Sequence, residues 1–350
     1  MKKYIVLIMI SGISILIACK QNTKQVEQQV QIDDEALIKM AKSTFGVLPE
    51  FANNPNNPLS DAKVALGRFL YFDKQLSKNG NISCNSCHAL NNFGVDNEKT
   101  SPGDDSIRGE RNTPTVFNAA LHSTQFWDGR AKDVEEQAGM PILNPIEHGI
   151  PDKTFLEKRI KSIEMYKGLF SQAFPDEKEP ISFNNIAKAI AAFERKMITP
   201  SRFDKYIAGD IAALNVTEKE GFKLFMETGC NTCHIGPALG GALFQKFGLY
   251  GDYWLETKSE KQDKGRSEIT KSETDTYFFK VSGLRNVSKT APYFHDGSVA
   301  DLHEAVRIMA KLQLNKDLSV DNINKIVSFL ESLTGDIPDN MKESPLAAKQ

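Results

Sequence analysis

Two motifs of the form C-x-x-C-H constrain this 350-residue chain more than any other feature of its sequence. They are Cys84-Asn85-Ser86-Cys87-His88 and Cys230-Asn231-Thr232-Cys233-His234. Two thiols at this spacing reach the two vinyl groups on one haem edge, and the following histidine can bind the iron. Two copies, each with Asn second and Ser or Thr third, predict two covalently bound haem c groups. The alternative is a Cys/His zinc site, in which the repeated histidine would be accidental.

The cysteine count agrees with two haem groups. The chain has five cysteines, of which the motifs use Cys84, Cys87, Cys230 and Cys233, and the fifth is Cys19. We therefore expect neither a disulfide nor a thiol nucleophile.

The N-terminus is typical of a bacterial export signal, with a short cationic head followed by apolar residues 5–17. The sequence Leu16-Ile17-Ala18-Cys19 resembles a lipobox, in which cleavage leaves a lipid-modified cysteine at the new N-terminus. We therefore predict a lipoprotein signal over residues 1–19, lipidation of Cys19, and a flexible tether over residues 20–34. A plain signal peptide or an uncleaved anchor is the alternative.

These features predict a location on the periplasmic side of a bacterial membrane, held by the lipid anchor only. After Cys19 no apolar stretch is long enough for a membrane helix. Lys20 rather than Asp follows the cysteine, which favours the outer membrane.

Composition indicates an ordinary soluble protein outside the signal. Hydrophobic residues make up 40% and charged residues 25% of the chain. The formal net charge of −2 and the lack of a basic block argue against a nucleic-acid partner. The length suits two domains.

Helical patterns predominate, and no segment shows a convincing series of alternating strands. Thr217 and Glu220 have the order of a capping box. Ser60 is a candidate cap for a helix that starts at Asp61. Helices are expected over residues 34–41, 61–71, 152–165, 182–197, 217–228, 299–314 and 321–333. The fold class predicted is therefore mainly α, with long loops.

A second repeat indicates internal duplication. Arg111-Asn112 precedes Phe126-Trp127-Asp128-Gly129, and Arg285-Asn286 precedes Phe294-His295-Asp296-Gly297. Each pair of segments follows its own C-x-x-C-H motif.

From this repeat we predict two cytochrome c-like haem domains. The first spans residues 35–199 and the second residues 200–335, with the joint near Thr199-Pro200-Ser201. Residues 336–350 are expected to form a loose tail.

The two halves differ in their candidate sixth iron ligands. Met309 lies on a predicted helix, whereas Met140 is flanked by Gly139 and Pro141, which we expect to break the helix. Met309 is therefore the better candidate, and a core methionine is the alternative. A His/Met haem has a raised potential and suits electron transfer, and an open distal side suits chemistry on a small ligand.

The chain resembles the bacterial di-haem cytochrome c peroxidases from about Ala36 to Leu333. Long motifs in the right order carry the resemblance. They are Ile82–His88, Arg111-Asn112-Thr113-Pro114-Thr115-Val116, Gln125-Phe126-Trp127-Asp128-Gly129-Arg130, Gly229–His234, Leu284-Arg285-Asn286 and Tyr293-Phe294-His295-Asp296-Gly297.

The resemblance implies a division of labour. The His88 haem would be peroxidatic, and the His234 haem, with Met309, would receive electrons from outside. Trp127 matches a tryptophan between the haems, where it would bridge electron transfer, pack the domain interface, or do both.

The resemblance also implies polar residues and a second metal. Gln137 and Glu147 match the distal polar residues, and a carboxylate beside the iron can take a proton from one peroxide oxygen and deliver it to the other. A calcium ion would lie between the domains, bound by the Asn112 side chain and the carbonyl oxygens of Thr290 and Pro292.

One departure from the family concerns Asp104. Many members carry a histidine there, which blocks the peroxidatic iron until the other haem is reduced. His122 and His148 could replace it only from different loops. We hypothesise that the peroxidatic haem is open, or water-bound, in the oxidised enzyme.

The leading function is reduction of hydrogen peroxide to water with electrons from a small periplasmic cytochrome c or cupredoxin. One alternative is a di-haem oxidase acting on a protein or organic substrate, against which Met309 weighs because such relatives typically have tyrosine there. Another is a plain di-haem electron carrier, which would need both irons six-coordinate. Family members commonly form homodimers, and no feature of this sequence decides that point.

Overall fold

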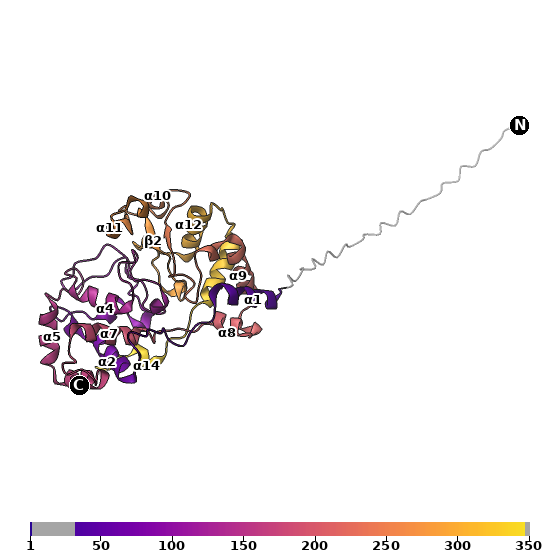
Figure 1. The fold of residues 1–350 in the computed structure, drawn as a ribbon. Helices are drawn as coiled ribbons and strands as arrows, with labels where there is room; N and C mark the ends of the chain where they lie inside the picture. Colours follow the sequence, from indigo (N-terminus) through magenta and orange to yellow (C-terminus); the bar gives the residue numbers. More distant parts are fainter. Residues whose placement is uncertain (2–31, 347–350) are drawn as a thin grey trace. The chain divides into compact units, whose positions relative to one another are not determined.

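Helices are the main regular structure of this protein in the computed structural model, which describes residue 1 and residues 32–346 (Figure 1). The α-helices are α1 Asp34–Phe45, α2 Asp61–Phe72, α3 Cys84–Cys87, α4 Val134–Leu143, α5 Lys153–Lys161, α6 Glu164–Ala173, α7 Phe183–Glu194, α8 Arg202–Ala208, α9 Val216–Thr228, α10 Tyr253–Thr257, α11 Ser267–Thr270, α12 Leu302–Leu314, α13 Val320–Ser332 and α14 Asp339–Lys342. Short 3₁₀ turns include η1 Lys74–Leu76 and η5 Cys230–Thr232. The prediction of a mainly α protein is confirmed.

The described strands form one two-stranded antiparallel sheet. Strand β1, Phe244–Lys246, pairs with β2, Phe278–Lys280, in a register that sets Gln245 opposite Phe279. All the described elements from Ile32 onward belong to one structural unit, Ile32–Gln350.

Three hydrophobic clusters form the core. The first gathers apolar side chains of α2, α4, α5, α6 and α7, the second those of α1, α8, α9 and α13, and the third those of β2, α10 and α12. The predicted domain limits stay a prediction, but α1, which they place with the first half, packs in the second cluster through Leu37, Ala41 and Phe45.

The first two clusters are built around the same kind of helix crossing. A Cβ on Gly67 of α2 would lie 1.9 Å from the Ala189 carbonyl oxygen of α7. A Cβ on Gly221 of α9 would lie 1.8 Å from the Lys325 carbonyl oxygen of α13. Only glycine permits these backbones to approach so closely.

Of two expected helix caps, one is confirmed and the other differs in the structure. Ser60 does cap α2, accepting a hydrogen bond from the Lys63 amide at 3.2 Å. The capping box of α9, however, uses Asn215 and Glu218 rather than Thr217 and Glu220, because the helix begins one residue earlier than expected.

The helix expected over residues 152–165 is two helices, α5 and α6. Ser162 ends α5, with its hydroxyl bonded to the Arg159 carbonyl oxygen at 2.7 Å, and such local bonds compete with helix continuation. Ile163 then has extended backbone and starts α6.

The expectation that Gly139 and Pro141 break the helix around Met140 is wrong. Helix α4 continues through Pro141 to Leu143. The proline lies in the last turn, where its missing N–H removes a single bond, and its carbonyl oxygen still accepts from the Asn144 amide.

The expectation of a loose tail over residues 336–350 is also wrong for the residues that the structure describes. Met341 of α14 and Leu346 pack against the first cluster, which includes Ile337. Arg68 of α2 donates to the Glu343 carbonyl oxygen at 2.7 Å, and Figure 1 shows α14 beside α2.

Within residues 32–346 no helix is both long and apolar enough to cross a bilayer. Cys19, the signal and most of the tether lie outside the described residues.

Candidate haem and peroxide sites

The first motif lies on a short helix that presents its histidine for metal binding. Ser83 and Ser86 form a capping box around α3, which carries Cys84 and Cys87. His88 Nδ1 donates to the Pro114 carbonyl oxygen at 3.0 Å, which leaves Nε2 for a metal. Both cysteines are free thiols, as attachment to a haem requires.

The second motif is held in the same way. His234 Nδ1 lies 3.2 Å from the Leu239 carbonyl oxygen and 3.1 Å from that of Ser282. Burial lowers the pKa of His88 and of His234, which favours the neutral imidazole that binds iron.

A cavity of about 340 Å³ adjoins the second motif, within the ~300–1,000 Å³ range of ligand sites. Its lining includes Cys230, Cys233, His234 and Met309, so both candidate axial residues face one space. Most of the other lining residues are apolar. Thiols, an N-protonated imidazole and an apolar enclosure fit a haem c.

The polar side chains predicted for the first site come from α4 and the turn after it. Gln137 and Glu147 are both half-buried. Asn144, which caps the end of α4, donates its side-chain amide to Glu147 Oε1 at 2.7 Å. Burial raises the pKa of Glu147, with the Asn144 hydrogen bond and the charge of Arg130 acting in the opposite direction.

Two contacts place Glu147 near the first motif: Cys87 Sγ lies 3.9 Å from the Pro102 carbonyl oxygen, and the Asp104 amide, two residues further on, donates to the Glu147 carbonyl oxygen at 2.8 Å. Burial raises the pKa of Cys87 to about 11, and the negative charge of Glu147 contributes to that rise. It also contributes to the raised pKa of Cys84. The carboxylate is therefore within Coulombic range of both thiols.

Trp127 lines the cavity and is held by one hydrogen bond from its side chain and one to its main chain. Its indole Nε1 donates to the Asn112 carbonyl oxygen at 2.9 Å. Its own carbonyl oxygen accepts from the Lys280 amide of β2 at 2.7 Å.

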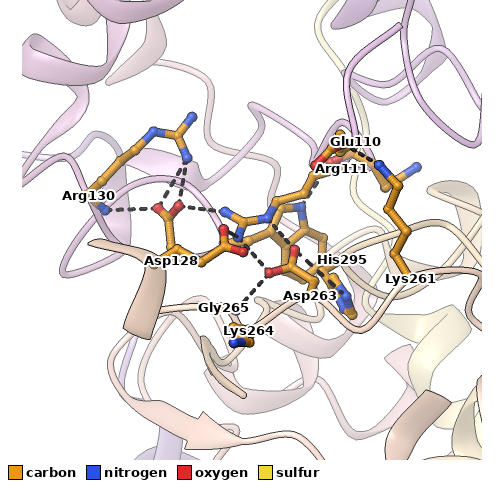
Figure 2. A network of polar contacts seen from close by, with 12 residues as sticks. Glu110, Arg111, Asp128, Arg130, Lys261, Asp263, Lys264, Gly265 and His295 are labelled. Carbon is orange, nitrogen blue, oxygen red and sulfur yellow. Dashed lines mark hydrogen bonds and ion pairs between the residues drawn. The ribbon is translucent and has the colours of Figure 1, made fainter. Parts of the chain in front are cut away.

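An ion network next to Trp127 joins segments far apart in sequence (Figure 2). Arg111 contacts Asp128 at 2.5 Å and Asp263 at 2.6 Å. Arg130 contacts Asp128 at 3.0 Å. His295 is buried, with Nε2 4.0 Å from the Asp263 carboxylate. Both repeats of the Arg-Asn and Asp-Gly pattern thus contribute to a single network.

Comparison with known proteins identifies the family. A family model described as "Di-haem cytochrome c peroxidase" matches residues 61–212. The cytochrome c551 peroxidase of Pseudomonas aeruginosa is 44% identical over 307 residues, which cover 87% of this chain and 88% of that protein. The chain belongs to the di-haem cytochrome c peroxidase family. It is therefore an enzyme of the cytochrome c peroxidase class, and this family carries two haem c groups.

Two further similarities agree with this family assignment. The cytochrome c551 peroxidase of Nitrosomonas europaea is 45% identical over 295 residues, covering 82% of this chain and 86% of that protein. The crystal structure of a MauG-like protein associated with microbial copper homeostasis has a TM-score of 0.76 and 30% identity, covering 85% of this chain and 97% of that chain.

The position at which many family members have a blocking histidine is occupied by Asp104. Its side chain is buried and hydrogen-bonded to the segment Ser77–Asn81. The two other histidines considered for that role are engaged elsewhere. His148 Nδ1 bonds the Leu76 carbonyl oxygen at 3.0 Å, and His122 Nδ1 lies 3.0 Å from the Lys280 ammonium.

The three predicted calcium-binding residues of this peroxidase all line the cavity: Asn112, Thr290 and Pro292. Asn112 Nδ2 donates to the Glu98 and Lys99 carbonyl oxygens at 3.0 and 3.3 Å, which leaves Oδ1 for a cation. Residues 32–346 hold no cluster of three His, Cys, Asp or Glu side chains placed for a metal. The oxygen donors named here belong to other residue types, and the calcium site stays a prediction.

Sequence reasoning missed two side chains at the first motif. Tyr71 donates to the His88 carbonyl oxygen at 2.7 Å. Glu194 is buried, burial raises its pKa to about 8, and its charge contributes to the raised pKa of Cys84. Glu194 follows Ile186 and Ile190 at spacings of four, so the apolar stripe of α7 could have revealed it.

Proposed function

We propose that this peroxidase reduces hydrogen peroxide to water at the His88 haem, with electrons that enter at the His234 haem. The observation that carries the proposal is an asymmetry between the two motifs. A half-buried carboxyl, Glu147, lies within Coulombic range of the first, whereas the second shares its cavity with Met309. One site offers a proton-transfer group, and the other offers a second iron ligand.

The chemistry required of the protein at the first site is proton transfer. The reaction consumes one hydrogen peroxide, two electrons and two protons and releases two water molecules. A haem supplies the electron acceptor and donor chemistry when bound. Glu147 takes a proton from the oxygen that attaches and delivers it to the oxygen that leaves. Asn144 orients the carboxylate, and Gln137 offers an amide to the same space.

Electron entry uses the second half. Met309 and His234 would hold a high-potential haem, suited to accept one electron at a time from a small periplasmic cytochrome c or cupredoxin. Trp127, which lines the cavity and bonds Asn112, would carry electrons toward the first haem.

We further propose that the peroxidatic haem is open without reductive activation. Support comes from Asp104, whose carboxylate accepts hydrogen bonds from Ser77, Asn79 and Asn81. A carboxylate committed to these donors is not available as an iron ligand.

Export, lipidation and calcium complete the proposal. Cys19 would carry a lipid on the periplasmic side of the membrane, and intact-mass analysis showing an unmodified Cys19 would exclude it. Calcium at Asn112, Thr290 and Pro292 would be detected by elemental analysis of the purified protein.

The proposed duplication, with a domain joint near residue 200, is supported by the matching helix crossings of α2 with α7 and of α9 with α13.

The deciding experiment is peroxide-dependent oxidation of a reduced monohaem cytochrome c. It starts once with fully oxidised and once with half-reduced enzyme. Equal and immediate turnover supports a peroxidase with an open site. Turnover only after reduction keeps the peroxidase and removes the open site. No turnover in either favours the di-haem oxidase or the electron carrier.

A further inference from the structure

The loop of residues 101–109, called here the Asp104 loop, lies directly against the main chain that carries Glu147. A Cβ on Gly103 would lie 1.7 Å from the Ile146 carbonyl oxygen, so only glycine fits at this contact. The Asp104 amide donates to the Glu147 carbonyl oxygen at 2.8 Å. The Gly103 amide donates to the Ile107 carbonyl oxygen at 2.8 Å and closes the loop on itself. A displacement of this loop would therefore remove a direct support of Glu147.

The Asp104 side chain ties this loop to a second segment, Ser77–Asn81. Its carboxylate accepts hydrogen bonds from Ser77 Oγ at 2.9 Å, the Asn79 amide at 2.6 Å and the Asn81 amide at 3.1 Å. The residue is only 5% exposed. Burial acts to raise the pKa of Asp104, but the three hydrogen bonds and the nearby His148 hold it below its ordinary value. The ionised carboxylate is thus the form that these contacts stabilise.

The Ser77–Asn81 segment is itself hydrogen-bonded to two other parts of the chain. Arg159 of α5 donates to the Ser77 carbonyl oxygen at 2.6 Å and to that of Lys78 at 3.0 Å. The Lys78 amide donates to the carbonyl oxygen of His148 at 2.8 Å. Because His148 directly follows Glu147, the segment supports the same stretch of chain as the Asp104 loop. The Asp104 carboxylate adds a third set of hydrogen bonds to this segment.

We propose that Asp104 is a positioning residue, whose carboxylate locks the Asp104 loop against Ser77–Asn81 and so fixes Glu147 beside the first haem motif. The inference rests on the proposed function, in which Glu147 transfers the peroxide proton. The lock consists of protein–protein hydrogen bonds alone, so it does not depend on the oxidation state of either haem.

The test compares Asp104→Asn with Asp105→Asn in the haem-loaded protein. An asparagine keeps the shape of Asp104 but offers one acceptor oxygen and sets its NH₂ against backbone donors. Asp105 is the matched control, because its side chain is 44% exposed and, within residues 32–346, makes its side-chain polar contacts with Lys78 and the Asn79 side chain. Ser77→Ala removes one donor and tests the same lock where the Asp104 variant does not fold.

Hydrogen exchange at the Asn79 and Asn81 amides reports the lock directly. We expect Asp104→Asn to accelerate it by about ten-fold or more, Ser77→Ala by a smaller factor, and Asp105→Asn not at all. Peroxide turnover should fall by on the order of 10–100-fold in Asp104→Asn, because misplacement by about 1 Å costs that much. The acid limb of the rate profile should move to lower pH as water reaches Glu147 and its pKa falls.

The outcomes separate this inference from the proposed function. Faster exchange with unchanged turnover and an unmoved acid limb would leave a structural lock and overturn the positioning role. Unchanged exchange in both Asp104→Asn and Ser77→Ala would overturn the lock. A wild-type protein without turnover would overturn the peroxidase proposal, and with it the positioning role, while the exchange data would still decide the lock.

Discussion

The two C-x-x-C-H motifs hold their histidines in similar ways and differ in the other side chains that lie near them. In each, the histidine Nδ1 donates to backbone carbonyl oxygens, at Pro114 for His88 and at Leu239 and Ser282 for His234. The second motif shares an apolar cavity with Met309. The first has instead a carboxylate, Glu147, held by Asn144 and by the Asp104 loop. Under the proposed function, a repeated attachment motif would set how a haem is held, and the different residues near each motif would set what that haem does.

Replacement of Glu147 should have the largest effect on the difference between the two sites, because it removes the carboxylate that lies near the first motif. Glu147→Gln keeps the shape but cannot accept the peroxide proton, so peroxide turnover should fall by about 10²–10⁴-fold, the usual worth of acid–base catalysis. Because burial raises the pKa of Glu147, wild-type activity should decline as the pH falls through a value above the ordinary range of a glutamate, and the variant should lack this limb. Steady-state kinetics across pH checks both points. Glu136→Gln, an exposed change on α4, is the control, and a similar loss there would contradict a specific role.

Replacement of Met309 tests the other side of the comparison. Met309→His should lower the potential of the His234 haem by a fraction of the ~0.8 V range that axial ligands cover, since Met/His ligation raises it. Redox titration followed by optical spectroscopy measures both haems separately. Met140→Leu is the matched control on α4. An unchanged His234 potential in Met309→His would assign Met309 to the core rather than to the iron.

The sequence predicted those features that depend on local chemistry. The attachment motifs, the mainly α fold and most helix positions needed only spacing and periodicity. The continuation of α4 through Pro141 was missed because the cost of proline depends on where the helix ends. The packing of α1 in the second cluster and the hydrogen bonds of Asp104 were not predictable, because both depend on contacts between distant segments. Glu147 became a site residue only through family resemblance, since its neighbours in sequence look like an ordinary loop.

Thr199 offers a test of how the two halves are coupled. Its hydroxyl accepts hydrogen bonds from the Asn118 side chain at 2.8 Å and from the Asn286 side chain at 3.0 Å. Asn118 follows the first Arg-Asn pair, and Asn286 belongs to the second. Both asparagines have left-handed backbone with φ of 62°. All three residues are buried. One hydroxyl therefore accepts hydrogen bonds from two asparagine side chains that lie far apart in sequence.

Thr199→Val should lower the free energy of unfolding by about 2–4 kcal/mol, because it leaves two buried amide groups without an acceptor. Denaturant titration of the haem-loaded protein measures the change. Thr199→Ser keeps the hydroxyl and should lose much less. Equal losses in the two variants would mean that the methyl group rather than the shared hydrogen bonds stabilises the junction.

The smallest expected effect concerns the connection between the two sites. Trp127→Phe keeps an aromatic ring but removes the hydrogen bond from Nε1 to the Asn112 carbonyl oxygen. A barrier raised by about 1.4 kcal/mol would slow electron transfer between the haems about ten-fold, which stopped-flow spectroscopy of the half-reduced enzyme after peroxide mixing would resolve. Trp254→Phe is the natural control, since Trp254 is the other tryptophan of the chain and packs against Tyr253 and Tyr277. An unchanged transfer rate together with reduced stability would make Trp127 a packing residue. Electrons would then pass between the His88 and His234 haems by another route, such as the ion network of Arg111, which joins the same segments.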